Sequence, residues 1–193
     1  MMSLSKLGLL LLIGVFSATV QADYQLDSAQ SSLHFVSIKK DKIAETHSFQ
    51  RLSGSISSDG AAKIIIDLAS VETNIPIRNE RMKSLLLETA VYPTAEVSAT
   101  LDEAQLTNIP LGATIILPTT LTLDLHGQSK AIQAELRVTS IEGGALLVTT
   151  VRPVLLSAFD FSLDAGIQKL MEVANLPSIS TAVPVTFTLI FKR

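Results

Sequence analysis

The chain has 193 residues, of which 47% are hydrophobic and 17% charged, and its formal net charge is −3. This apolar composition excludes a disordered chain, and the slightly acidic balance argues against a nucleic acid partner. Because it has no cysteine, a disulfide scaffold, a thiol nucleophile and a cysteine-ligated zinc site are excluded. The length suits one domain that can bury a core or enclose a cavity.

The first 22 residues are predicted to form a cleavable signal peptide. Lys6 supplies a positive charge, residues 7–16 form an apolar run, and Val20 and Ala22 fit the small-residue rule for cleavage after Ala22. The apolar run is too short for a membrane span, which needs about 20 residues. We therefore expect a soluble mature domain, residues 23–193, exported to a bacterial periplasm.

Alternation of apolar and polar residues dominates the remaining chain and predicts antiparallel strands. The pattern is clearest at residues 132–139 and 185–191, and it recurs at residues 121–125 and 64–68. One face of each strand is then packed and the other is wet.

Turn and helix signals divide these strands. The dipeptides Asp59-Gly60, His126-Gly127 and Gly143-Gly144 predict tight turns, the second of them a hairpin. Residues 78–88 and 166–176 carry helical apolar stripes and predict two short helices. Short strands at close spacing indicate an up-and-down barrel or a sandwich in one domain.

The sequence offers no catalytic or metal-binding motif. Its three histidines, His34, His47 and His126, have no metal-ligand spacing, and no nucleophile elbow or phosphate-binding glycine loop occurs. Glu45 and His47 are interpreted as part of a solvated turn, with a metal or acid–base pair as the alternative. His34 is expected to face solvent or to pack at a rim, and His126 is expected to lie in a turn. We therefore predict no catalytic residues, no metal and no cofactor.

Several motifs resemble the YceI-like family. They are Ser-Val-Glu-Thr-Asn at 70–74, Arg78-Asn79, Tyr-Pro-Thr-Ala at 92–95, the Leu-Thr-Leu hairpin beginning at 121, and Phe-Asp-Phe at 159–161. The resemblance implies an all-β fold, an extended eight-stranded antiparallel lipocalin-like β-barrel with one or two short helices. It also implies that the barrel holds a long isoprenoid lipid or quinone tail in the periplasm, and it implies no catalytic residues.

From this resemblance and the strand alternation we predict a ligand site. The barrel lining is expected to contain Phe35, Phe49, Leu121, Leu123, Ala134, Leu136, Phe187 and Leu189. A lid is expected from Met82, Leu85 and Leu86, and Arg78 is expected to meet a polar head group. A barrel of about eight strands either holds one small ligand or is filled by side chains.

The predicted function is therefore that of a soluble periplasmic carrier. The alternatives are a filled-core interaction or stress-response protein without a ligand, and an enzyme acting on a small amphiphile. The charged segment 39–45 is interpreted as a solvated loop, with a partner or transient membrane contact as the alternative. Dimerisation through an exposed strand edge stays open.

Overall fold

The computed structural model describes residues 22–193. The predicted signal peptide lies outside them, except for Ala22, so its cleavage stays a prediction. Within the described residues no helix has the length and apolarity needed to cross a membrane. The strands are β1 (Ala22–Leu26), β2 (Ser32–Lys39), β3 (Ile43–Phe49), β4 (Leu52–Ser57), β5 (Ala61–Asp67), β6 (Val71–Glu72), β7 (Thr94–Thr100), β8 (Thr114–Leu125), β9 (Gln128–Ile141), β10 (Ala145–Thr150), β11 (Val154–Ser157) and β12 (Ala182–Lys192).

Short helical segments connect and cover the strands. They are η1 (Ser28–Gln30), η2 (Leu68–Ser70), α1 (Pro76–Arg81), η3 (Met82–Leu86), α2 (Glu103–Thr107), η4 (Glu142–Gly144), η5 (Ala158–Phe161) and α3 (Asp164–Ala174). The helices predicted from the apolar stripes correspond to α1 with η3, and to α3. The turn η3 is π-helical, because the amide of Leu87 donates to the carbonyl of Met82.

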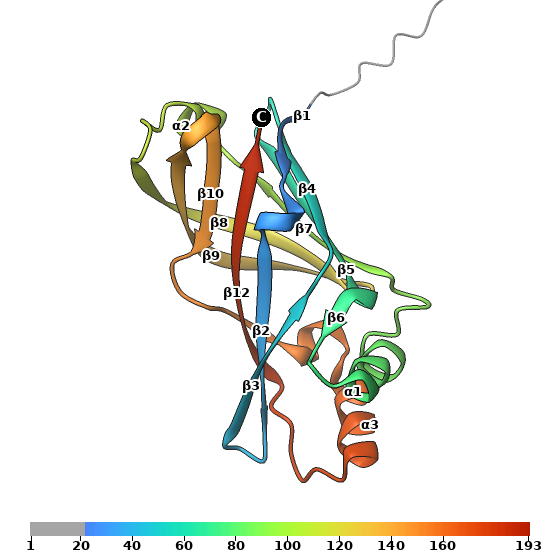
Figure 1. Cartoon of the computed structure of the whole chain (residues 1–193). Helices are drawn as coiled ribbons and strands as arrows, with labels where there is room; N and C mark the ends of the chain where they lie inside the picture. Colours follow the sequence, from blue (N-terminus) through green and yellow to red (C-terminus); the bar gives the residue numbers. More distant parts are fainter. Residues whose placement is uncertain (1–21) are drawn as a thin grey trace, which may run out of the picture.

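The strands close into an eight-stranded antiparallel barrel, which confirms the predicted fold. Neighbouring strands follow the order β1-β4-β5-β7-β8-β9-β10-β12, and β12 pairs with β1 to close the circle. The long strand β12 continues below β1 and β10, where it pairs with β2 on one side and β11 on the other. This continuation makes the barrel elongated, with α1 and α3 beside its lower end (Figure 1).

Tight turns set the register of the hairpins. His126 and Gly127 have φ of 52° and 75°, as a type I′ turn requires, so Leu121 lies opposite Ile132. Gly60 and Gly143 also have positive φ between paired strands. The turn dipeptides that the sequence predicted are thus confirmed.

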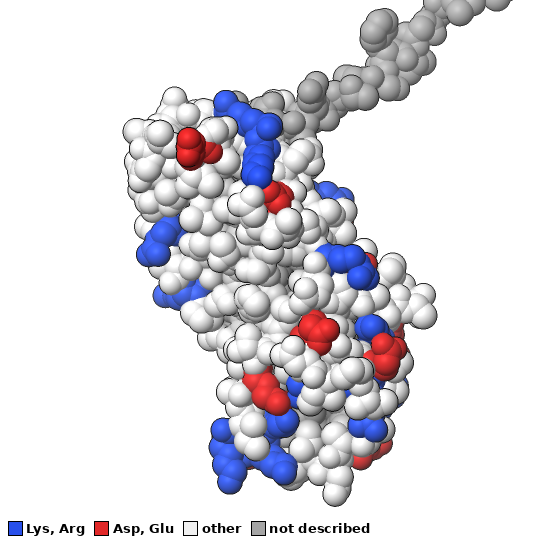
Figure 2. Space-filling view, in the orientation of Figure 1, with Lys and Arg blue, Asp and Glu red and all other residues white. Residues whose placement is uncertain are grey.

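The charged segment 39–45 belongs to a fourth hairpin, so its interpretation as a loop was wrong. Lys39 ends β2 and Ile43 begins β3, and only residues 40–42 form the turn. Lys40 and Asp41 have φ of 52° and 58°, which again suits a tight turn between twisted strands. This β2–β3 hairpin projects beyond the closed barrel, and Lys and Arg side chains gather over its tip (Figure 2).

Two seams of the barrel wall are short. The seam between β12 and β1 holds two residue pairs. The other short seam joins β7 and β8. Their register holds only three pairs, from Glu96 opposite Asp124 to Ser98 opposite Thr122. A groove of about 750 Å³ follows this seam, and polar side chains such as Thr100, Gln105 and Thr120 contribute much of its lining. Dimerisation through an exposed strand edge stays a prediction.

Candidate functional site

The lower half of the barrel encloses a cavity of about 460 Å³, which we call the main cavity. Its lining comes mainly from strands β2, β3, β5, β7, β8, β11 and β12 and from the segments α1, η3, η5 and α3. Its size falls within the usual range of small-molecule sites. Ile75, Ile77 and Ala174 line it and are also exposed, so the cavity opens between the β2–β3 hairpin, α1 and α3.

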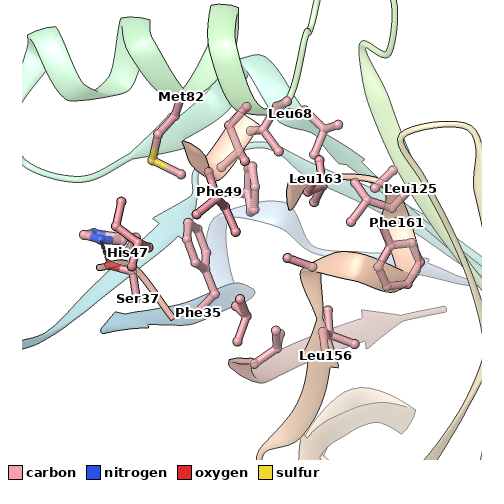
Figure 3. A pocket seen from close by; sticks show the side chains of 18 of the residues that line it. Phe35, Ser37, His47, Phe49, Leu68, Met82, Leu125, Leu156, Phe161 and Leu163 are labelled. Carbon is pink, nitrogen blue, oxygen red and sulfur yellow. Dashed lines mark hydrogen bonds between the residues drawn. The ribbon is translucent and has the colours of Figure 1, made fainter. Parts of the chain in front are cut away.

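Most of the lining is aliphatic or aromatic. Leu156, Phe161 and Leu163 face the space from one side, and Phe35 and Phe49 face it from the other (Figure 3). The two phenylalanine rings lie 5.4 Å apart between centroids. The polar side chains of the lining are Ser37, Lys39, Glu45, His47, Arg78, Arg81, Ser157 and Ser180. Such a lining favours a long apolar ligand with a small polar end.

A second, smaller space of about 80 Å³ lies deeper in the barrel, and we call it the inner cavity. The two cavities share a ring of lining residues, namely Leu33, Ile66, Val97, Leu121 and Phe187. One layer of side chains therefore separates the two spaces. Val138 and Leu146, which line the inner cavity, are each only 2% exposed, so this space is shut off from solvent on their side.

Most of the predicted site residues lie around these cavities. The main cavity is lined by Phe35, Phe49, Arg78, Met82, Leu86, Leu121, Leu123 and Phe187, and the inner cavity by Leu136 and Leu189 among others. The alternation rule placed the strand residues among them on the inner face, because each strand of a barrel has one face turned inward. Their contact with a ligand stays a prediction.

Two predicted lining residues lie elsewhere. Leu85 does not line the main cavity, because the extra residue in the π-helical turn shifts it off the stripe of Met82, and its carbonyl faces Gly166 of α3 instead. Ala134 points inward but lines neither cavity, and its short side chain packs against the hydrophobic core.

His47 is a cavity residue, so its interpretation as part of a solvated turn was wrong. It is only 3% exposed, lines the main cavity, and its Nε2 lies 2.9 Å from Oγ of Ser37 (Figure 3). The Phe35 ring packs against it edge-on, with 5.3 Å between centroids. Burial lowers the pKa of His47, and the charge of Arg78 lowers it further, so the ring is neutral at pH 7.

Glu45 fastens the hairpin to helix α1. Its Oε2 lies 2.7 Å from Nζ of Lys39 and 2.8 Å from Nη1 of Arg78, while Nη2 of Arg78 donates to the carbonyl of Thr73 at 2.6 Å. The hydrogen bond from Lys39 and the charge of Arg78 hold the pKa of Glu45 below its ordinary value. Arg78 therefore positions the helix over the cavity as well as lining it.

A Glu45→Gln variant should lose stability in a pH-dependent way. Because the folded-state pKa of Glu45 is lowered, its stabilisation is present above the unfolded value of about 4.3 and disappears as the pH falls through the folded value. We expect a loss of about 1 kcal/mol at pH 7 that shrinks below pH 4, measured by urea unfolding. Glu80→Gln, at an exposed pair with Lys83, is the control and should change little. Equal losses at pH 7 and pH 3 would contradict the assignment.

The other histidines lie outside the cavity. His34 is exposed on β2, as expected. His126 lies in its predicted turn, where Nε2 is 3.0 Å from Oε2 of Glu88 and the ring packs on Tyr92. Among residues 22–193 no group of three or more His, Cys, Asp or Glu side chains has an arrangement that could hold a metal ion.

Sequence reasoning missed the part of the lining that residues 154–174 contribute. Leu156, Phe161, Leu163, Ile167 and Leu170 all line the main cavity. The apolar stripe of the helix at 166–176 was a signal for Ile167 and Leu170, since such a stripe has to be buried against something. The helical pattern did not indicate that these side chains border a cavity instead of packing against other side chains.

Comparison with known proteins gives one family. The YceI-like domain matches residues 24–191. A polyisoprenoid binding domain from Saccharophagus degradans, implicated in plant cell wall breakdown, is 42% identical, and the match covers 89% of this chain and 99% of that one, with a TM-score of 0.88. No curated protein matches the chain.

More distant structures share the fold alone. BcnA of Burkholderia cenocepacia is 17% identical with a TM-score of 0.67, covering 86% of this chain and 98% of its own. A YceI protein of Campylobacter jejuni is 16% identical with a TM-score of 0.54, covering 75% and 82%. Since the domain match spans nearly all of the described residues, this chain belongs to the YceI-like family.

Proposed function

We propose that this chain is a periplasmic carrier that shields the tail of a long isoprenoid lipid or quinone in its main cavity. The observation that carries the proposal is the apolar cavity of about 460 Å³, whose opening is lined by a few polar side chains. The 42% identical polyisoprenoid binding domain supports the same ligand class. A filled-core protein without a ligand would not leave this space, because protein interiors pack closely.

The physical basis of a carrier is a balanced transfer. Removing an apolar tail from water gains roughly 0.8 kcal/mol per CH₂ group, but the competing environment of this lipid is a membrane. The hydrophobic gain nearly cancels when the tail moves from a bilayer into an apolar cavity. The protein can therefore collect and return its cargo across an aqueous gap.

Native mass spectrometry of the protein purified from a bacterial periplasm tests the proposal. We expect an added mass that extracts into organic solvent and matches a prenyl lipid or quinone, and an N-terminus that starts at Asp23. A bare protein that takes up no prenyl lipid when one is offered would overturn the carrier function.

Exposed apolar residues at the opening suggest where the cargo passes to a membrane. Ile75 and Ile77 are 43% and 59% exposed, and Arg78 and Arg81 lie next to them in the chain. An Ile77→Glu variant should slow the transfer of a prenyl lipid between anionic vesicles about tenfold, a larger effect than any loss of affinity measured in detergent. Leu111→Glu, at a 73% exposed loop residue, is the control. Equal slowing by both variants would contradict a contact through α1.

One observation favours an enzyme as the second candidate. The contact between Ser37 and His47 resembles a nucleophile with its base. Nδ1 of His47, however, has no carboxylate to which it donates, as it would in a full triad. A fluorophosphonate probe distinguishes the two functions. Labelling that depends on Ser37 would indicate an activated serine, and the carrier function predicts no labelling.

A further inference from the structure

The inner face of the β2–β3 hairpin changes from charged to apolar along its length. Three opposed pairs line the main cavity, and from the hairpin tip inward they are Ser37–Glu45, Phe35–His47 and Leu33–Phe49. Lys39, nearer the tip, also lines the cavity and is bonded to Glu45. An amphiphile would match this order with its polar end toward the tip and its tail in the barrel.

His47 lies at the boundary between the two regions, and it has an unused hydrogen-bonding atom. Its Nε2 is engaged by Ser37, but its Nδ1 is buried without a hydrogen-bond partner of proper geometry. The backbone of Thr46 has the smallest influence on the pKa of His47, and it makes no hydrogen bond of proper geometry to Nδ1. An unpaired polar atom in an apolar interior costs free energy, so native proteins keep few of them. A functional role, such as binding a ligand, is one explanation for those that they keep.

The chemistry of this pair selects an uncharged oxygen. A neutral imidazole has one donor and one acceptor nitrogen, and a serine hydroxyl can donate or accept. When Ser37 donates to Nε2, Nδ1 carries the proton and can donate to a carbonyl. In the other tautomer Nδ1 accepts from a hydroxyl. A diphosphate fits less well, because the adjacent cations Lys39 and Arg78 are already bonded to Glu45.

We propose that Ser37 and His47 form a head-group site, in which Nδ1 of His47 hydrogen-bonds the terminal carbonyl or hydroxyl oxygen of the prenyl lipid. The inference rests on the proposed function, since it names the polar end that the carrier recognises. The tail then extends past Phe35 and Phe49 into the main cavity.

Four probes with the same C20 prenyl tail separate the contributions of head and tail. They are menaquinone-4, geranylgeraniol, geranylgeranyl diphosphate and the matching C20 hydrocarbon. Affinities are measured for the wild type, His47→Phe, Ser37→Ala and the control His34→Phe, which changes an exposed histidine on β2, the strand paired with β3. We expect His47→Phe to weaken binding of the quinone, the alcohol or both about tenfold, the effect of one neutral hydrogen bond. Hydrocarbon binding should be unchanged, and His34→Phe should alter nothing.

The outcomes separate this inference from the proposed function. If no probe binds the wild type, the carrier function fails. If all four bind and His47→Phe changes none or weakens all equally, or if the diphosphate binds most tightly, only the head-group site fails. Loss with the quinone alone assigns a carbonyl, and loss with the alcohol alone assigns a hydroxyl.

A measurement on the unaltered protein covers the case in which His47→Phe does not fold. The chain has only three histidines, so ¹⁵N-labelled imidazole signals are readily assigned. Addition of menaquinone-4 or geranylgeraniol should shift the Nδ1 signal of His47 and leave that of His34 in place. An unchanged Nδ1 signal in a saturated complex would overturn the head-group site.

Discussion

A Val185→Trp variant is expected to lose prenyl-lipid binding by at least about a hundredfold, or about 2.8 kcal/mol. Val185 lies on β12 opposite Phe35, and its side chain lines the main cavity. An indole ring at this position would occupy space that the lipid tail needs. Because that space is empty in the folded protein, the ring should enter it at little cost to stability.

The neighbouring residue provides a matched control. Thr186 is exposed on the opposite face of the same strand, so Thr186→Trp adds the same ring outside the barrel. Titration with geranylgeraniol should show wild-type affinity for Thr186→Trp and none for Val185→Trp, with similar unfolding midpoints. Undiminished binding by a folded Val185→Trp would place the ligand outside the main cavity.

A Gly166→Val variant is expected to lose about 2–3 kcal/mol of stability through overpacking. Gly166 is the point where α3 meets η3, and a Cβ atom there would lie 2.7 Å from the carbonyl oxygen of Leu85 and 2.8 Å from Cα of Leu86. These are backbone atoms, so the clash is relieved only if the helices separate. Separation would open the covered side of the main cavity.

Ala165→Val tests whether the effect comes from contact or from helix propensity. Ala165 is exposed on the same helix, so a valine there carries the propensity cost of a few tenths of a kcal/mol without the clash. Urea unfolding should show a large difference between the two variants. Similar losses would mean that α3 and η3 are not held by the close approach at Gly166.

The barrel was predictable because its signals are local. Period-two alternation and turn dipeptides act over a few residues, and they set the inward faces of β8, β9 and β12 correctly. It was not predictable that two positions in the wall beside β12 are each occupied by two separate strands, β1 with β2 and β10 with β11. Asp27 ends β1 by accepting from the amides of Ala29 and Gln30, and Pro153 comes between β10 and β11. The two strands of each pair are aligned because both of them form hydrogen bonds with β12, which is far away in the sequence.

The cavity lining was partly predictable for the same reason. Alternation identified Phe35, Phe49 and Phe187 as inward residues, and a resemblance in sequence supplied the idea of a ligand. His47 follows the same alternation, but the charged residues around it favoured a solvated position. The burial of His47 depends on α1, which the contact between Arg78 and Glu45 holds against the hairpin. These two residues are 33 positions apart, and a contact over that distance produces no periodic pattern in the sequence.

Under the proposed function, the ring of side chains shared by the two cavities would limit the length of the lipid tail that the barrel accepts. A prenyl chain that ends below Leu121 and Phe187 fits the main cavity without disturbing the core. Each further isoprene unit has to push these side chains aside and enter a space of only about 80 Å³, surrounded by close-packed residues. Under the proposed function, selection among cargoes of different length would therefore depend on the stiffness of the core and not on the chemistry of the head group.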